Sequence, residues 1–77
     1  MAQVHDLTKK KQDLADILEQ QIDRYTLTVV LDALEEVCFM KAQHLEENWQ
    51  DKASAKAWHD AAMRLDRTRQ FASDRQI

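Results

Sequence analysis

The side chains best suited to chemistry in this sequence are one cysteine, three histidines and fourteen carboxylates among 77 residues. Di-iron helical bundles use Glu-x-x-His motifs, but Lys41 and Lys56 stand three residues before His44 and His59. A lysine at that position would repel a metal cation. Zinc sites use Cys or His ligands placed a few residues apart, and the sequence contains no such pair. The spacing therefore predicts no metal site and no cofactor.

Cys38 and paired carboxylates are the remaining candidates for catalysis. Cys38 lies in the most apolar part of the sequence, where the thiolate form is disfavoured. We therefore expect it to be a small core residue. The absence of glycine excludes glycine-rich phosphate-binding loops, and a few short helices leave little room for a concave pocket. We expect no enzymatic activity, and a metal-binding or enzymatic helical bundle is the least favoured alternative.

Basic residues form a second possible site, for nucleic acid. They occur in a run at residues 9–11 and are spread through the last third of the chain, at Lys52, Lys56, Arg64, Arg67, Arg69 and Arg75. Nucleic-acid-binding domains are usually basic overall, whereas this chain has a formal charge of −3 and a pI of about 5.5. A nucleic-acid-associated regulator using a basic third helix is therefore the alternative function, and direct nucleic-acid binding is disfavoured.

The elements that must position these residues are α-helices. The sequence has no glycine and no proline, the two residues that most strongly interrupt helices. Apolar residues recur at helical spacing and predict three helices, at about 6–24, 27–48 and 52–72, in one domain spanning 1–77. Residues 1–12 contain few apolar side chains, so we expect this segment to fray.

The second predicted helix has the widest apolar surface. A heptad-like seam contains Leu27, Leu31, Leu34, Cys38 and Leu45, and beside it runs a stripe of Val30, Ala33, Val37, Met40 and His44. A helix that is apolar over so wide an arc must be covered from two sides. The third helix offers a thinner face, with Trp58 as its large anchor, formed by Ser54, Trp58, Ala61, Ala62, Leu65 and Ala72.

A break is expected between the second and third helices, near residues 48–51. One continuous helix is the alternative, but the seam of the second helix would then continue through Ala55, Ala62 and Arg69 and miss Trp58. Asn48 is the expected helix stop and Asp51 the next N-cap. Residues 26–51 carry one basic and six acidic side chains, and residues 52–77 carry six basic and three acidic ones. Opposite charge favours pairing, so we predict an antiparallel hairpin.

Self-association is expected because a chain this short buries too little surface to be stable alone. A single cysteine forms no internal disulfide and suits a reducing compartment. We predict a homodimeric helical bundle that associates through the seam of the second helix: Leu27, Leu31, Leu34, Cys38 and Leu45. The sequence leaves open whether the first helix packs on its own chain or is exchanged with the partner chain.

Candidate contacts for another protein are large apolar residues outside these faces. Phe39 falls as an isolated ring on an acidic arc, Met63 and Phe71 lie among charged residues, and Trp49 and Trp58 flank the turn. Singly exposed apolar residues are common, so a purely structural role is the alternative for each. Lys41 is the reverse case, a charge on an apolar face. It could extend to solvent, pair with a carboxylate of another helix, or mark an open end of the seam.

One block of the sequence resembles a known group of proteins. Residues 36–62, EVCFMKAQHLEENWQDKASAKAWHDAA, and above all NWQDKASAKAW, are similar to small uncharacterised helical proteins of cyanobacteria. The resemblance covers about a third of the chain and implies a bacterial cytosolic setting, without implying any functional residue. No signal sequence and no membrane-spanning apolar run is apparent, so we expect a cytoplasmic protein. Together these features favour a non-enzymatic protein–protein interaction module: a regulator, an adaptor or a subunit of a larger assembly.

Overall fold

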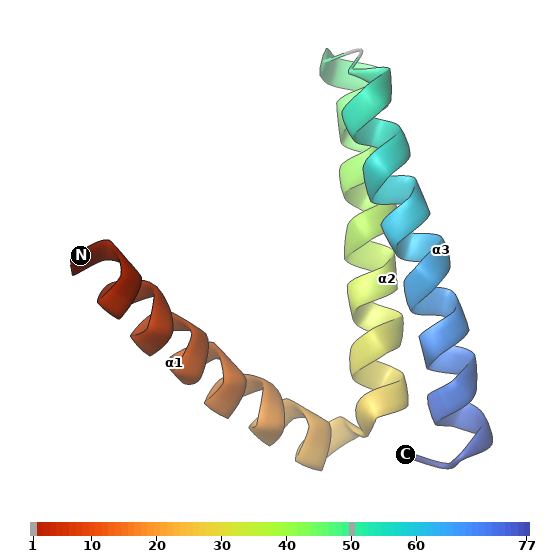
Figure 1. The fold of residues 1–77 in the computed structure, drawn as a ribbon. Helices are drawn as coiled ribbons and strands as arrows, with labels where there is room; N and C mark the ends of the chain where they lie inside the picture. The colour runs from red at the N-terminus through yellow and green to blue at the C-terminus, as the bar shows by residue number, and fades with distance from the viewer. Residues whose placement is uncertain (1, 50) are drawn as a thin grey trace.

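The fold is a helical hairpin with one helix projecting from its base (Figure 1). The computed structural model describes residues 2–49 and 51–77, and the side chains of residues 7–48 and 51–77. Its elements are α1 (Ala2–Tyr25), α2 (Leu27–His44), the π-helical turn η1 (Leu45–Trp49) and α3 (Lys52–Asp74). No strand occurs in the described residues. The predicted all-α fold is confirmed, and α3 runs back along α2 over its length (Figure 1).

A single residue connects α1 to α2. α1 is helical from Ala2, ahead of the expected start at Asp6, and it ends at Tyr25, while α2 begins at Leu27. The connecting Thr26 has φ 94° and ψ 157°, a region that is costly for a β-branched residue. Its hydroxyl accepts a hydrogen bond from the Val29 N–H at 3.3 Å. Thr26 is therefore both the bend between the two helices and the N-cap of α2.

The chain reverses between α2 and α3 without glycine or proline. The break predicted near residues 48–51 is confirmed, and so is the N-cap, because Asp51 Oδ1 accepts a hydrogen bond from the Ser54 N–H at 3.1 Å. Asn48 is not the helix stop that we expected. It lies inside η1, with its Nδ2 2.9 Å from His44 Nδ1. The wider π-helical turn continues α2 before the chain turns back, and the Asp51 N–H donates to the Leu45 carbonyl at 3.2 Å.

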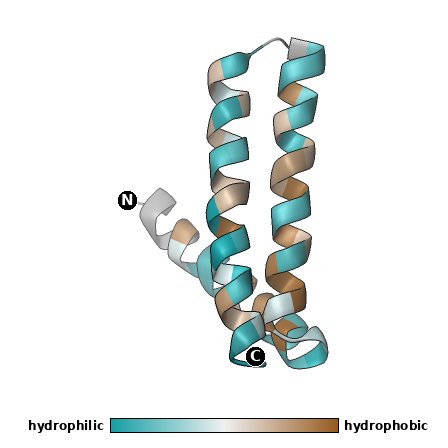
Figure 2. Cartoon of the chain, turned by 90° about the vertical axis from the view of Figure 1, so that its right-hand side faces the viewer, coloured by the Kyte–Doolittle hydropathy of each residue, from teal (hydrophilic) through white to brown (hydrophobic). Residues whose placement is uncertain are grey.

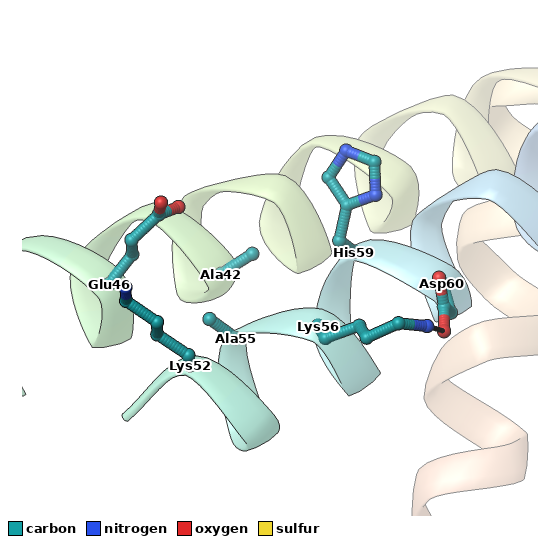
Figure 3. Close-up of a pocket in the computed structure, with 7 residues that line it drawn as sticks. All are labelled: Ala42, Glu46, Lys52, Ala55, Lys56, His59 and Asp60. Atoms are coloured by element: carbon teal, nitrogen blue, oxygen red, sulfur yellow. Dashed lines mark hydrogen bonds and ion pairs between the residues drawn. The ribbon is translucent and has the colours of Figure 1, made fainter. Parts of the chain in front are cut away.

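Small side chains form the contact between α2 and α3. The prediction of Cys38 as a small core residue is confirmed, because it is 5% exposed. Ala62 and Ala72 have no exposed surface at all. Ala42 of α2 and Ala55 of α3, which are neighbours in Figure 3, are each 6% exposed. Small residues at the contact allow helix axes to approach closely. The hairpin therefore has a narrow, alanine-rich interior.

The face of α3 that meets α2 is not centred where the sequence suggested. Of the predicted face, Ala62 and Ala72 are buried and Ser54, Ala61 and Leu65 are half-buried. Ala55 and Arg69 extend the contact on one side, so its centre is shifted away from Trp58. Trp58 lies at the edge of the hairpin and is 37% exposed. Its predicted role as the central anchor of the contact was wrong. Two helices packed through alanine leave no space for an indole ring between them.

Two polar contacts hold the hairpin together away from the alanines. At its base, the Thr28 N–H donates to the Ile77 backbone oxygen at 3.1 Å, and the Ile77 N–H donates to the Ala72 carbonyl at 3.0 Å. Farther along, Arg69 Nε of α3 donates to Glu35 Oε2 of α2 at 3.0 Å, and its Nη2 also bonds Asp66. The two helices, which carry opposite net charge, thus meet in an ion pair at Arg69.

Candidate functional site

The residues that could do chemistry do not converge. Within residues 7–48 and 51–77, whose side chains are described, no three His, Cys, Asp or Glu side chains gather in a group that could hold a metal. The His44 ring bonds Asn48, and the His59 ring lies against Phe39. Cys38 is enclosed between α2 and α3. No helix in the described part is long and apolar enough to cross a lipid bilayer.

The main feature of the surface is apolar. Hydrophobic and hydrophilic segments alternate along the helices (Figure 2). Among the described side chains, every buried hydrophobic one belongs to a cysteine or an alanine. A continuous set of apolar residues runs from one side of α1, across the bend, along α2 to the edge of α3. We call this set the open apolar face, and it consists of Leu7, Leu14, Leu18, Tyr25, Val30, Ala33, Leu34, Val37, Met40 and Trp58.

The α1 part of the open apolar face has no cover over most of its length. Leu7 and Leu14 are 63% and 54% exposed, and α1 makes no contact with α3 in the described part of the chain. Only the last turns of α1 meet α2, where Leu18 and Tyr25 share an open groove of about 380 Å³ with Val30. α1 is therefore an arm, held at its C-terminal end.

The α2 part of the open apolar face lies beside the hairpin contact. Val37 and Met40 line a second open groove, of about 490 Å³, together with Trp58 from α3. Lys41 borders this groove, and its Nζ lies 5.8 Å from the centre of the Trp58 ring. This distance is within the range of a cation–π contact. Of the alternatives for Lys41, the structure thus favours an open end of the apolar stripe, with the ammonium over the indole.

The seam predicted for self-association is divided by the fold. Leu31 and Leu45 are half-buried and Cys38 is buried, on the side of α2 that α3 covers. Leu27 is half-buried near the bend, whereas Leu34 is 46% exposed and belongs to the open apolar face. Self-association stays a prediction. A second copy that approached through Cys38 would have to displace α3, so the accessible side of α2 is the neighbouring stripe.

The other predicted contact residues do not form one surface. Phe39 is not an isolated ring, because it packs edge-to-face on His59 with ring centroids 5.3 Å apart. Met63 and Phe71 are 48% and 54% exposed on α3, and the Arg75 guanidinium lies 4.9 Å from the centre of the Phe71 ring. The side chain of Trp49 lies outside the described part of the chain. Of the four whose side chains the structure describes, Trp58 belongs to the open apolar face and Phe39 lies beside it, in a groove shared with Met40.

Carboxylates engage part of the basic third helix. Lys56 Nζ donates to Asp60 Oδ2 at 2.8 Å, an ion pair drawn as a dashed line in Figure 3. This hydrogen bond lowers the pKa of the Asp60 carboxyl below its ordinary value. Arg69 is held by Glu35 and Asp66. Two of the six cations of the predicted basic patch therefore already have anionic partners, and the nucleic-acid alternative stays a prediction.

Sequence reasoning missed the arm. It treated the first half of α1 as weak, yet Leu7, Leu14, Leu18 and Tyr25 lie seven, four and seven residues apart, which places them on one side of a helix. That spacing was the available signal for an apolar side of α1, and the fraying expected of residues 1–12 stays a prediction. Comparison with protein-family models, with curated proteins and with solved structures finds no match to this chain.

Proposed function

We propose that this chain is a small non-enzymatic protein-interaction module that binds through the open apolar face. The observation that carries the proposal is the inversion of the usual burial pattern. Leu7, Leu14, Val37 and Met40 are each close to half exposed or more, while alanines and one cysteine are buried. Soluble monomers rarely leave a contiguous apolar surface of this kind uncovered, and such patches mark interaction sites.

The open apolar face can supply enough binding free energy for a specific complex. Fully burying one large apolar side chain contributes about 1.5–3 kcal/mol. Eight of its members, all except Val30 and Ala33, are large side chains between 37% and 63% exposed. Covering them would contribute on the order of 10 kcal/mol before the entropic costs of association, which are about 4–15 kcal/mol. The balance suits a complex of moderate affinity.

The shape of the face favours a helical partner. Its α1 and α2 parts are both stripes on helices, and an amphipathic helix can lay its own apolar stripe along them. Lys41 at the end of the Trp58 groove provides one positive charge, which would favour a partner with a carboxylate at that end. The free cysteine suits the reducing cytosol, so the proposed module is a cytosolic regulator, adaptor or assembly subunit.

The proposal is tested by immobilising the chain and comparing what its variants retain from cell extract. Val37→Glu places a charge at the centre of the open apolar face, and Met63→Glu places one at a similarly exposed residue elsewhere, since the two side chains are 46% and 48% exposed. We expect Val37→Glu to lose the retained proteins and Met63→Glu to keep them. Identical sets from the two variants would contradict the proposal.

A further inference from the structure

We propose that the occupant of the open apolar face is a second copy of this chain, with α1 of each copy lying on the α2 stripe of the other. This inference rests on the proposed function and names its partner. Three features of the structure support it: the short connection at Thr26, the matching repeats of α1 and α2, and the presence of both complementary surfaces on one chain.

The connection limits α1 to contacts with the start of α2 in its own chain. Antiparallel helices that lie side by side have axes about 8–10 Å apart and are joined by loops of about 2–5 residues. Here α1 ends at Tyr25 and α2 begins at Leu27. One residue is too short for that reversal, so α1 projects away from the hairpin (Figure 1). The α1 surface around Leu7 and Leu14 therefore needs an occupant from outside the chain.

The two uncovered stripes share one period, and the α1 stripe is the longer. On α1, Leu7 and Leu14 are seven residues apart, as are Leu18 and Tyr25; on α2, Val30 and Val37 have the same spacing. Heptad stripes of this kind pack along one another. The α1 stripe spans roughly 27 Å between Leu7 and Tyr25 at ~1.5 Å per residue, which is longer than the roughly 21 Å from Val30 to His44. One α1 arm is therefore long enough to cover a whole α2 stripe.

Two-fold symmetry closes such an assembly. Each copy carries both an arm and a stripe that receives one, so two copies satisfy each other and leave no arm free to recruit a third. A short, strained connection is also the situation that favours exchange of a helix between chains, and Thr26 has φ 94°. Lys11 and Gln21 interrupt the apolar repeat of α1, and polar residues in a heptad seam set register and oligomer state.

The first test is the mass of the full chain at micromolar concentration by sedimentation equilibrium. We expect twice the chain mass of 9.1 kDa. Leu14→Glu and Val37→Lys should each give the chain mass, because each puts a charge into both α1–α2 contacts of the dimer. Both residues are exposed in the single chain, so circular dichroism should show unchanged helix content. Met63→Glu is the control and should remain a dimer.

The second test mixes the Leu14→Glu and Val37→Lys chains. In the exchanged dimer, one α1–α2 contact then contains only natural residues, and in the other the new glutamate meets the new lysine. We expect the equimolar mixture to recover the dimer mass. A dimer built from α1 on α1 and α2 on α2 would have a substituted residue in both contacts of the mixed pair, and no full recovery would follow.

The outcomes separate this inference from the proposed function. A monomeric natural chain, a dimer that survives both single substitutions, or a mixture that stays monomeric would each overturn the exchange. If the natural chain is monomeric but retains another protein through Val37, the exchange is refuted and the interaction module stands. If it is a dimer that recovers on mixing, the second copy is established as the occupant of the face.

Discussion

Single side chains set the geometry of this hairpin at a few positions. Arg69 joins α3 to Glu35 of α2 and to Asp66 of its own helix. The hydrogen bonds with Asp66 and then with Glu35 raise the pKa of the Arg69 guanidinium above its ordinary value. Because arginine is protonated throughout the accessible pH range, the Arg69 guanidinium keeps its charge in this contact. Asp51, by contrast, titrates in an accessible range.

Replacing Arg69 by Met should lower the thermal unfolding midpoint. The substitution leaves Glu35, whose side chain is 14% exposed, and Asp66 without their cation, and an unpaired carboxylate is costly where solvent access is restricted. Unfolding followed by circular dichroism measures the effect. Arg67→Met, on an exposed residue of the same helix, is the matched control. Equal midpoints for the two variants would show that the Arg69 contact adds nothing to stability.

The cap of α3 should make the hairpin sensitive to acid. The Ser54 backbone N–H, and after it the Ser54 side chain, lowers the pKa of Asp51 below 3.8. A folded-state pKa below the unfolded one means that the stabilisation is present above pH 3.8 and is lost as pH falls through the lower value. We expect Asp51→Asn to unfold with a weaker dependence on pH below that point, because Asn caps a helix without titrating. If the stability of both proteins fell equally with pH, titration of the Asp51 cap would not be the cause of the acid sensitivity.

The helices of the hairpin owe their close contact to small residues. Ala55, Ala62 and Ala72 of α3 are buried against an α2 surface that includes Cys38 and Ala42. This arrangement pushes Trp58 and the larger residues of α2 to the sides, where they become part of the open apolar face. The exposed apolar surface and the narrow interior thus both follow from packing α2 and α3 through small residues.

Enlarging Ala62 should destabilise the hairpin more than enlarging an exposed alanine. Ala62 has no exposed surface, so Ala62→Leu must separate the helices or force strained rotamers, at a cost of about 1–3 kcal/mol. Ala57, on the same helix, is exposed, and Ala57→Leu should change stability by less than about 0.5 kcal/mol. Urea unfolding of both variants measures the difference. If Ala62→Leu and Ala57→Leu changed the free energy of unfolding equally, the close contact of α2 and α3 at Ala62 would be contradicted.

The molecule as a whole is more extended than a compact domain of the same length. Its radius of gyration is 15.1 Å, whereas a compact domain of this length would have one of about 11–12 Å. Its smallest dimension is 15 Å, little more than the ~10–12 Å diameter of one helix with side chains. A single layer of helices cannot enclose large side chains on both sides. The open apolar face is therefore a property of the architecture as well as of individual residues.

Lengthening the connection at Thr26 should convert an exchanged dimer into a closed monomer. Inserting three glycines after Thr26 brings the connection into the range of helical hairpin loops, so α1 can fold back on α2 of its own chain. We expect sedimentation to give the chain mass and small-angle scattering to give a radius near that of a compact domain. The same glycines placed before Met1 are the control and should leave the dimer intact. A lengthened chain that remained a dimer would contradict the role of the short connection.

Local sequence signals were sufficient for the helices and for some of their ends. Helix along most of the chain follows from the absence of glycine and proline and from good helix formers. Asp51 was identified as an N-cap because capping depends on a side chain and a backbone N–H only three residues away. Cys38 was placed in the core because it lies in the most apolar segment. Each of these conclusions needs only neighbours along the chain.

Tertiary packing determined the contact face of α3, the long-range polar contacts and the direction of α1. How the predicted face of α3 is rotated against α2 depends on how closely two helices distant in sequence can approach, and close packing through alanine leaves Trp58 at the edge of the contact. The Glu35–Arg69 and Thr28–Ile77 contacts join residues far apart in the chain. The direction of α1 depends on the backbone of Thr26, whose positive φ no hydrophobic pattern encodes. That one torsion leaves the heptad stripes of α1 and α2 uncovered, and so creates the candidate binding surface.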